Sequence, residues 1–206
     1  MSHRFSLSLL AVAAVALAGC TAPGGNPAGG TAAHSHGSPP APGGGMMGRG
    51  MMGGGMMKGR MAVASLTPTQ GNNVRGLVMF HEMDGHLMVH AKVSGLKPNG
   101  EHGFHVHETG SCASTDGSSA GGHFNPDGKP HGPQNAAHHV GDLPSLKADA
   151  NGVVDQKMMV MGPTIAAGAM SVVGRSVIVH ALPDDFVTQP TGNSGARLGC
   201  GVIATH

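Results

Sequence analysis

Short, largely apolar runs bounded by turn residues dominate the chain from residue 61 onward. Turn sequences such as GNN, MDG and KPNG separate the first of these runs, and no run shows a sustained 3.6-residue period with helix caps. Short runs of this kind between turn residues are typical of strands. The pattern predicts strands at 61–66, 74–80, 86–96, 103–108, 152–161, 170–181 and 198–205.

Two intervals between these strands, 109–151 and 182–197, are too long and too polar to be simple connections. Long loops on a β scaffold commonly carry the function of the protein. Many short strands joined by glycine-rich turns are typical of an antiparallel sandwich or barrel. We therefore expect an all-β domain at 61–206 with two long functional loops.

The first 19 residues follow a different pattern. Arg4 precedes the apolar run FSLSLLAVAAVALA, and the sequence LAGC ends at Cys20. This order predicts a signal peptide, because the apolar run is too short to span a membrane comfortably. LAGC is similar to the lipobox of bacterial lipoproteins, which implies that Cys20 is lipidated and anchors an exported protein in the periplasm or cell envelope. A plain secretory signal with a chance cysteine is the alternative.

Residues 20–60 are rich in Gly, Pro, Ala and Ser and have no apolar period, which predicts a disordered tether. His34, His36 and three methionine pairs lie within it. Thioether sulfur is a soft ligand suited to Cu(I), and imidazole binds copper as well. Copper acquisition by residues 34–57 is one hypothesis, and a linker whose repeats drifted without function is the other.

Charge is almost balanced, with 12 Lys and Arg against 11 Asp and Glu, so nothing indicates a nucleic-acid partner. Once Cys20 is set aside, Cys112 and Cys200 form an even pair in a chain that is expected to be exported. No Cys-x-x-Cys is present, which excludes a thiolate zinc finger. A bridge between the two cysteines would add at most about 4–5 kcal/mol of stability in the chain-entropy model. Two buried free thiols are the alternative.

The histidines gather in patterns that suit metal ions. GFHVHE places His105 and His107 on one face of a strand, roughly 6.6 Å apart, a span that two imidazoles can close around one ion. Taken alone, this motif is more typical of an ordinary strand with two surface histidines. The loop GGHFNPDGKPHGPQNAAHHVGD contributes His123, His131, His138, His139 and Asp142. Three imidazoles and a carboxylate make the closed tetrahedral shell that structural zinc prefers. SVIVHA adds His180 at a strand end as a further candidate ligand.

GFHVHE, GGHFNP, HxxxxxxxHVGDL, VIVH and GNSGARLGCGVI follow one another in this order. With them the chain resembles the copper,zinc superoxide dismutases over roughly 61–206. The resemblance implies a Greek-key antiparallel β-barrel or immunoglobulin-like sandwich. It also implies an enzyme that converts superoxide to dioxygen and hydrogen peroxide by cycling copper between Cu(II) and Cu(I), with a structural zinc.

The resemblance also implies the ligands of each metal. Copper would take His105, His107, His123 and His180, and zinc would take His123, His131, His139 and Asp142. His123 would bridge the two metals as an imidazolate and donate a proton during turnover. Either His138 or His139 fills the third zinc position by count, and His139 is preferred because it directly precedes VGD.

Four other residues match positions of the same family. Arg197 matches an arginine beside the copper channel, where a fixed positive charge would guide the superoxide anion. Asp184 matches a carboxylate that links a copper histidine to a zinc histidine, with Asp185 as the neighbouring alternative. Cys112 and Cys200 match the internal disulfide. The remaining histidines are expected to be ordinary polar residues: His81, His86, His90, His102 and His206.

An exported copper-binding or storage protein on the same fold is the alternative function. It would explain the methionine-rich tether, but it has no need of Arg197 or of a zinc cage. Superoxide would be the small-molecule partner of the enzyme, and the lipidated Cys20 would be its contact with the membrane.

Overall fold

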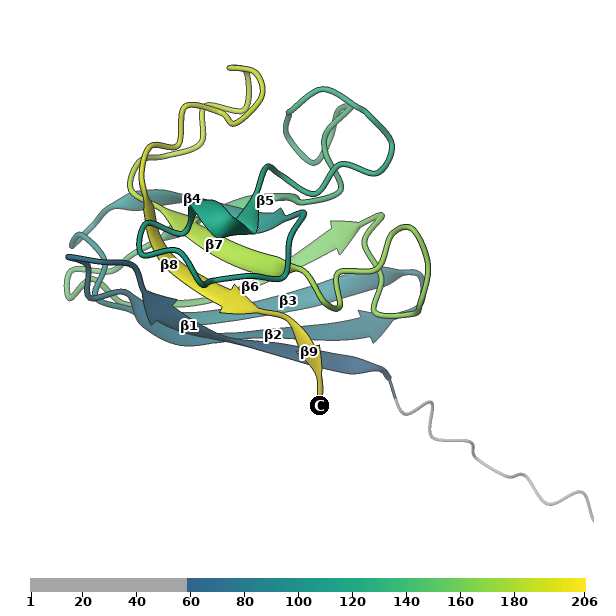
Figure 1. Cartoon of the computed structure of the whole chain (residues 1–206), viewed down its shortest axis with the longest axis horizontal. Coiled ribbons are helices and arrows are strands. Elements are labelled where there is room, and N and C mark those ends of the chain that lie inside the picture. The colour runs from purple at the N-terminus through teal and green to yellow at the C-terminus, as the bar shows by residue number, and fades with distance from the viewer. Residues whose placement is uncertain (1–58) are drawn as a thin grey trace, which may run out of the picture. The chain divides into compact units, whose positions relative to one another are not determined.

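In the part of the chain that the structure describes, nine β-strands form one antiparallel sheet that curls into a nearly closed barrel (Figure 1). The computed structural model describes residues 59–206. In chain order the strands are β1 (Met61–Pro68), β2 (Arg75–Met83), β3 (His86–Ser94), β4 (Glu101–His107), β5 (Asp142–Lys147), β6 (Val154–Met161), β7 (Ser176–His180), β8 (Arg197–Val202) and β9 (Ala204–Thr205). A 3₁₀ turn, η1 (Ser118–Ala120), lies between β4 and β5. The predicted all-β antiparallel fold is confirmed.

The strands follow the order β5-β4-β7-β8-β1-β2-β3-β6 across the sheet, and β9 pairs with β1. The two edge strands, β5 and β6, are joined through one side chain. Gln156 donates from Nε2 to the Ser145 carbonyl at 3.1 Å and accepts from the Lys147 amide at 3.1 Å. The Gln156 amide thus replaces the missing backbone ladder at the seam of the barrel.

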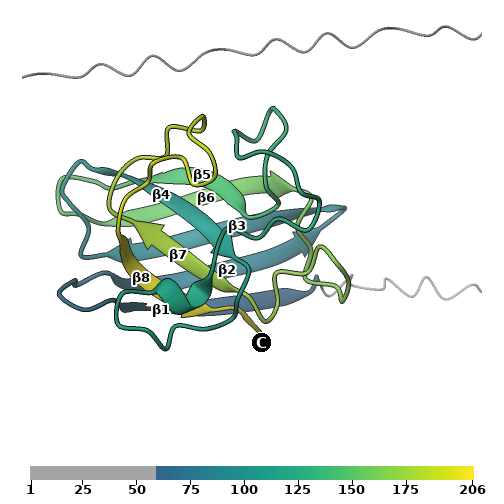
Figure 2. The ribbon, with the colours of Figure 1, turned by 45° about the horizontal axis from the view of Figure 1, so that its top comes forward.

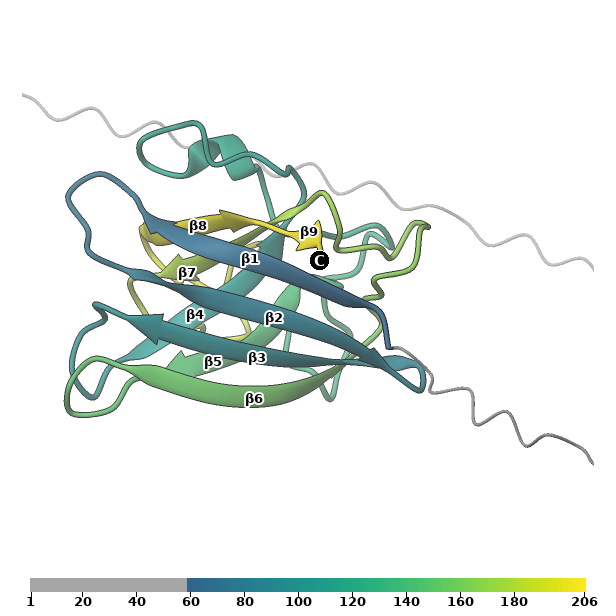
Figure 3. The same ribbon diagram turned by 90° about the horizontal axis from the view of Figure 1, so that it is seen from below.

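The core lies inside the barrel, because alternate residues of each strand point inward. Figure 3 shows β1, β2, β3 and β6 side by side as one wall. Phe80 on β2, Val89 on β3 and Met158 on β6 are neighbours in the register and are buried. Burial of each such side chain contributes about 1.5–3 kcal/mol.

Three strand predictions differ from the structure. β5 lies inside the interval 109–151, where we expected a loop. Its sequence, DLPSLK, contains Pro144 and is buried on both faces, so no alternation of apolar and polar residues marks it as a strand. Pro144 is tolerated because β5 is an edge strand,. The strand predicted at 170–181 begins only at Ser176, after a turn with Gly174 at φ 77°. The strand predicted at 198–205 divides into β8 and β9.

Two long connections, 108–141 and 181–196, rise on the same side of the barrel near β4, β5 and β7 (Figures 1 and 2). They correspond to the two predicted functional loops, apart from β5. Within residues 59–206 no helix is long and apolar enough to cross a membrane.

Candidate metal centre

The first cluster consists of four buried histidines: His105, His107, His123 and His180. β4 supplies two of them, because Phe104 and Val106 point into the core while the intervening histidines face the loops,. His180 ends the neighbouring strand β7. His123 belongs to the long loop and forms an isolated bridge with His107. One ligand atom of each histidine lies within 4.8 Å of the others.

Hydrogen bonds fix which nitrogens of this cluster are free. His107 donates from Nδ1 to the Gly121 carbonyl at 3.0 Å, and His180 donates from Nδ1 to the Gly195 carbonyl at 3.3 Å. Both Nε2 atoms therefore carry lone pairs, and they lie 3.3 Å apart,. His105 Nδ1 and His123 Nε2 are buried without a partner among the described residues. Facing lone pairs are stabilised by a cation, so this donor set fits a metal ion, and imidazole nitrogen suits copper.

The second cluster surrounds one carboxylate, Asp142 at the start of β5. Its oxygens lie 2.9 Å from His123 Nδ1, 3.0 Å from His131 Nδ1 and 3.2 Å from His139 Nδ1. Metal bonds of about 2.0–2.1 Å place tetrahedral ligands about 3.3–3.4 Å apart, close to these separations. His123 belongs to both clusters through its two ring nitrogens.

The second cluster also contains facing lone pairs. His131 donates from Nε2 to Asp184 at 2.8 Å, so its Nδ1 faces the Asp142 carboxylate as an acceptor unless a proton is added,. While these imidazoles are neutral, neither His131 Nδ1 nor His139 Nδ1 donates a hydrogen bond within the described part of the chain. A proton or a metal ion satisfies this arrangement, and three nitrogens with one oxygen are a donor set that fits zinc.

Asp184 connects the two clusters. Its carboxylate accepts from His105 Nε2 at 2.7 Å and from His131 Nε2 at 2.8 Å. Gly192 is required beside it, because a Cβ there would lie 1.8 Å from Asp184 Oδ1. Asp185, the alternative, is exposed and accepts from the amides of Val187 and Thr188 within its own loop.

Burial and the two carboxylates set the charges of the clusters. Burial lowers the pKa of His105 to about 4, against the opposing hydrogen bond to Asp184, and lowers the pKa values of His107 and His180 well below the usual range,. These imidazoles are neutral at pH 7, which is the form that binds metal. Burial would lower the pKa of His131 too, but hydrogen bonds to Asp142 and Asp184 outweigh it and raise the pKa to about 9. The same two carboxylates therefore favour any cation beside His131.

The two carboxyl groups themselves are held ionised. Burial disfavours their charge, but hydrogen bonds from His123 and His131 to Asp142, and from His105 and His131 to Asp184, bring both pKa values well below the usual range,. The centre therefore presents ionised carboxylates beside the neutral imidazoles of His105, His107 and His180, which is a combination that attracts a divalent cation.

Arg197 lies at the edge of the first cluster. It pairs with His180 in the register of β7 and β8. Its guanidinium donates to the Gly117 carbonyl at 2.7 Å and to the Gly121 carbonyl at 2.6 Å. Burial lowers the pKa of Arg197 from its usual value, but an arginine remains charged in proteins. The Gly121 carbonyl also accepts from His107, so one peptide orients both the arginine and a metal-ligand candidate.

The disulfide between Cys112 and Cys200, expected from the resemblance, is present, with Cα atoms 5.8 Å apart. It ties the loop that carries Gly117 and Gly121 to β8, three residues beyond Arg197. His138 is half-buried, and its Nδ1 lies 2.7 Å from the Ala136 carbonyl; it belongs to neither cluster. Cys20 and the interval 34–57 lie outside the described residues.

One expectation is wrong. His102, which we expected to be an ordinary polar residue, is 1% exposed and donates from Nδ1 to the carbonyl of His180 at 2.8 Å. It therefore fixes the backbone of a metal-ligand candidate. The sequence carried a weak signal for this burial. His102 is three residues from His105 and five from His107, and in a regular strand such odd spacings place it on the face opposite to the two ligand candidates. The pairing of β4 with β5 shifts register between His102 and Phe104.

Comparisons with known proteins agree with this geometry. Residues 74–203 match the family model described as copper/zinc superoxide dismutase (SODC). The superoxide dismutase-like protein YojM of Bacillus subtilis (strain 168) is 40% identical over 134 residues, covering 62% of this chain and 68% of that protein. Superoxide dismutase [Cu-Zn] 3 of Arabidopsis thaliana is 43% identical over 145 residues, covering 64% of this chain and 84% of that protein.

Two further matches extend the comparison. Superoxide dismutase [Cu-Zn] of Paramecium bursaria Chlorella virus 1 is 42% identical over 138 residues, covering 63% of this chain and 72% of that protein. A crystal structure of a double mutant of a SOD-like protein from Bacillus subtilis superposes with a TM-score of 0.63 at 40% identity, covering 68% of this chain and 94% of that chain.

Proposed function

Because this chain belongs to the copper/zinc superoxide dismutase family, which uses copper and zinc, we propose that it dismutates superoxide to dioxygen and hydrogen peroxide. One observation carries the proposal: both four-residue clusters are complete, buried and share His123. A family member that had lost dismutase activity because a metal ligand was replaced would lack one or more residues of these clusters.

The free nitrogens indicate which atoms would hold each metal. Copper would take His105 Nδ1 and the Nε2 atoms of the other three histidines of the first cluster. Zinc would take the Nδ1 atoms of the three histidines around Asp142, together with that carboxylate. Copper, when bound, supplies the one-electron exchange, so that two superoxide anions and two protons yield one dioxygen and one hydrogen peroxide.

Arg197 performs the attraction and orientation of substrate. Its guanidinium is a fixed positive charge beside His107 and His180, close enough to lower the pKa values of both. Two backbone carbonyls hold the guanidinium in place, so it is preorganised to bind a small anion with its remaining donors. This charge raises the local concentration of superoxide.

His123 performs the proton delivery. Its Nε2 is buried in the first cluster, while its Nδ1 is fixed against Asp142 at 2.9 Å. A proton held on Nε2 points into the copper cluster and can pass to the reduced substrate without a rearrangement of the ring.

The second candidate function is a copper-binding protein without dismutase activity. The name of the Bacillus subtilis relative, which is called superoxide dismutase-like, favours it. Under that function the chain would still bind metal in the histidine clusters, but the position of Arg197 would have no consequence.

Activity per copper decides between the two. The protein is loaded with copper and zinc, its metal content is measured, and the decay of superoxide is followed on the same sample with and without cyanide. We expect fast, cyanide-sensitive decay in proportion to copper content. A sample with about one copper and one zinc per chain that leaves the decay unchanged would favour the copper-binding function instead.

We propose further that the protein is exported and anchored through a lipid on Cys20. The LAGC sequence supports this proposal, and so does the internal disulfide, which is typical of oxidising compartments,. Incorporation of labelled fatty acid by the full chain, and its loss in Cys20→Ser, tests the anchor. Label retained by Cys20→Ser would contradict it.

A further inference from the structure

Sulfur and imidazole side chains also gather on the outer face of the barrel wall formed by β1, β2, β3 and β6 (Figure 3). None of them belongs to the buried clusters. The outward-facing members are Met61 on β1, Met79, His81 and Met83 on β2, His86, Met88 and His90 on β3, and Met159 and Met161 on β6.

Methionine is sorted to this outer face. The inward apolar residues of β2, β3 and β6 are Val78, Phe80, Leu87, Val89, Ala91, Val93, Val154, Met158 and Val160. The outward apolar residues of the same strands are Leu77, Met79, Met83, Met88, Met159 and Met161. Methionine also serves flexible apolar contacts, but its thioether sulfur adds a soft metal ligand that leucine and valine lack. The sorting therefore points to the sulfur atom itself.

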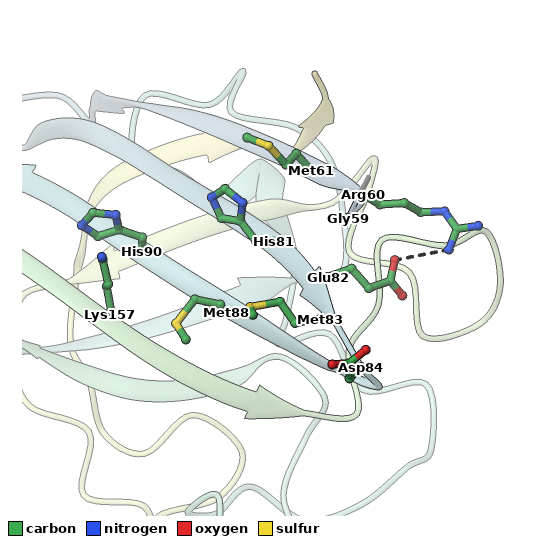
Figure 4. A pocket seen from close by; sticks show the side chains of 10 residues that line it. All are labelled: Gly59, Arg60, Met61, His81, Glu82, Met83, Asp84, Met88, His90 and Lys157. Carbon is green, nitrogen blue, oxygen red and sulfur yellow. Dashed lines mark ion pairs between the residues drawn. The ribbon is translucent and has the colours of Figure 1, made fainter. Parts of the chain in front are cut away.

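The register places imidazole between thioethers. His81 lies directly opposite Met61 on one side and Met88 on the other, and directly opposite residues have Cβ atoms about 4.5–5.5 Å apart. Met83 is two residues further along β2, on the same face. Figure 4 shows His81 between Met61 and the pair formed by Met83 and Met88, all lining one groove.

The ligand atoms of this groove are accessible. Met61 and Met83 are 39% and 47% exposed. Among the described residues His81 makes no side-chain hydrogen bond, whereas His90 is held by Asp155 at 2.5 Å. The positive charges of Arg60 and Lys157 are offset by the negative charges of Glu82 and Asp84 around the groove (Figure 4). The side chains around the groove therefore carry no net positive charge that would repel a monovalent cation.

We propose that Met61, His81, Met83 and Met88 form a surface site for Cu(I), separate from the buried clusters. Thioether ligands select soft Cu(I) over zinc and over hard cations, and an imidazole adds a compatible nitrogen. Because the groove opens to solvent, the ion can be taken up and released without opening the barrel. This site does not depend on dismutase activity.

Titration with Cu(I) tests the site. The full chain, with its buried clusters already loaded with zinc and copper, is titrated anaerobically with Cu(I) against a chromophoric Cu(I) chelator. We compare it with the triple variant Met61→Leu, Met83→Leu, Met88→Leu, which keeps the apolar volume and removes the sulfurs. We expect the variant to lose one equivalent of bound Cu(I), or to bind it about tenfold or more weakly.

The matched control removes three methionines from the tether: Met46→Leu, Met51→Leu and Met56→Leu. It should keep the equivalent that the surface triple variant loses. His81→Gln, a single change of a half-buried side chain on the outer face, should also weaken the binding of that equivalent. Methionine methyl NMR with Ag(I) as the redox-inert probe should show shifts at Met61, Met83 and Met88. The proposal fails if the surface triple variant binds as much Cu(I), as tightly, as the unchanged chain.

Discussion

At the scale of single residues, Arg197 shows how one register position serves function. It lies opposite His180 at the end of β7, and two glycine carbonyls from a distant loop hold its guanidinium. Neither contact stabilises the metal-ligand candidates directly, so substrate attraction and metal binding can be separated by mutation.

Arg197→Gln should lower the rate of superoxide consumption about tenfold or more, because the fixed positive charge is lost, while copper content stays the same. The dependence of the rate on salt should weaken too. Superoxide decay at two ionic strengths measures both effects. Arg75→Gln, an exposed arginine on β2, is the matched control and should leave the rate unchanged. An undiminished rate in Arg197→Gln would remove the assigned role.

His102 acts through another residue. His102→Ala would leave the buried His180 carbonyl without its donor, at a cost of about 1–3 kcal/mol in stability,. We expect copper to dissociate faster from this variant, with little effect on zinc, because only the first cluster contains His180. Separate release of each metal to a chelator measures this. His102→Asn keeps a donor near the same place and should restore part of the copper retention. Equal acceleration for both metals would indicate a merely structural role.

At the scale of elements, the disulfide links a loop to a strand. It fastens the segment that contains Gly117 and Gly121 to β8, which carries Arg197. The carbonyls that orient the guanidinium are thus positioned by a covalent bond.

The double variant Cys112→Ser, Cys200→Ser should lose up to about 4–5 kcal/mol in the free energy of unfolding, since a loop with a separation of 88 residues is no longer closed,. Urea unfolding measures the loss. The rate per bound copper should fall as well, because the arginine is less well oriented. If that rate matched the unchanged protein, the loop carbonyls would not need the disulfide.

The elements also show what a sequence can and cannot predict. Candidate ligands such as His105 and His123 could be found because few residue types bind metal and their spacing follows strand geometry. β5 could not be found, because an edge strand buried on both faces carries no alternation. His102 had only a weak signal in the sequence, because its contact with the His180 carbonyl depends on the pairing of β4 with β7. The outer methionines were visible at even spacings, as Met79 and Met83 in β2 and Met159 and Met161 in β6, but their common face required the pairing of strands.

At the scale of the whole molecule, the buried histidines make the stability of the metal-free protein depend on pH. His105, with its pKa lowered to about 4, cannot take up the proton that the unfolded chain binds near pH 6.5. Stability is therefore lost as pH falls from about 6.5 toward 4, by about 3 kcal/mol for this residue. His107 and His180 act in the same direction.

His131 acts in the opposite direction. Its pKa is raised to about 9, so its contribution is complete below about pH 6.5 and is lost as pH rises through 9,. Because the two effects oppose each other, we expect the free energy of unfolding of the metal-free protein to be highest at about pH 6.5–7. Urea unfolding of the metal-free chain from pH 4.5 to 9.5 measures this profile. Stability that rises steadily with acidity would contradict the neutral state of the three copper-cluster histidines.

Asp184 touches one imidazole from each cluster with its two oxygens. A shift of the His105 ring or of the His131 ring therefore moves the carboxylate that holds the other ring. This coupling does not involve His123. The two halves of the centre are coupled mechanically by two independent routes. Filling one half should prepare the geometry of its neighbour, so that loading proceeds cooperatively rather than as two unrelated events.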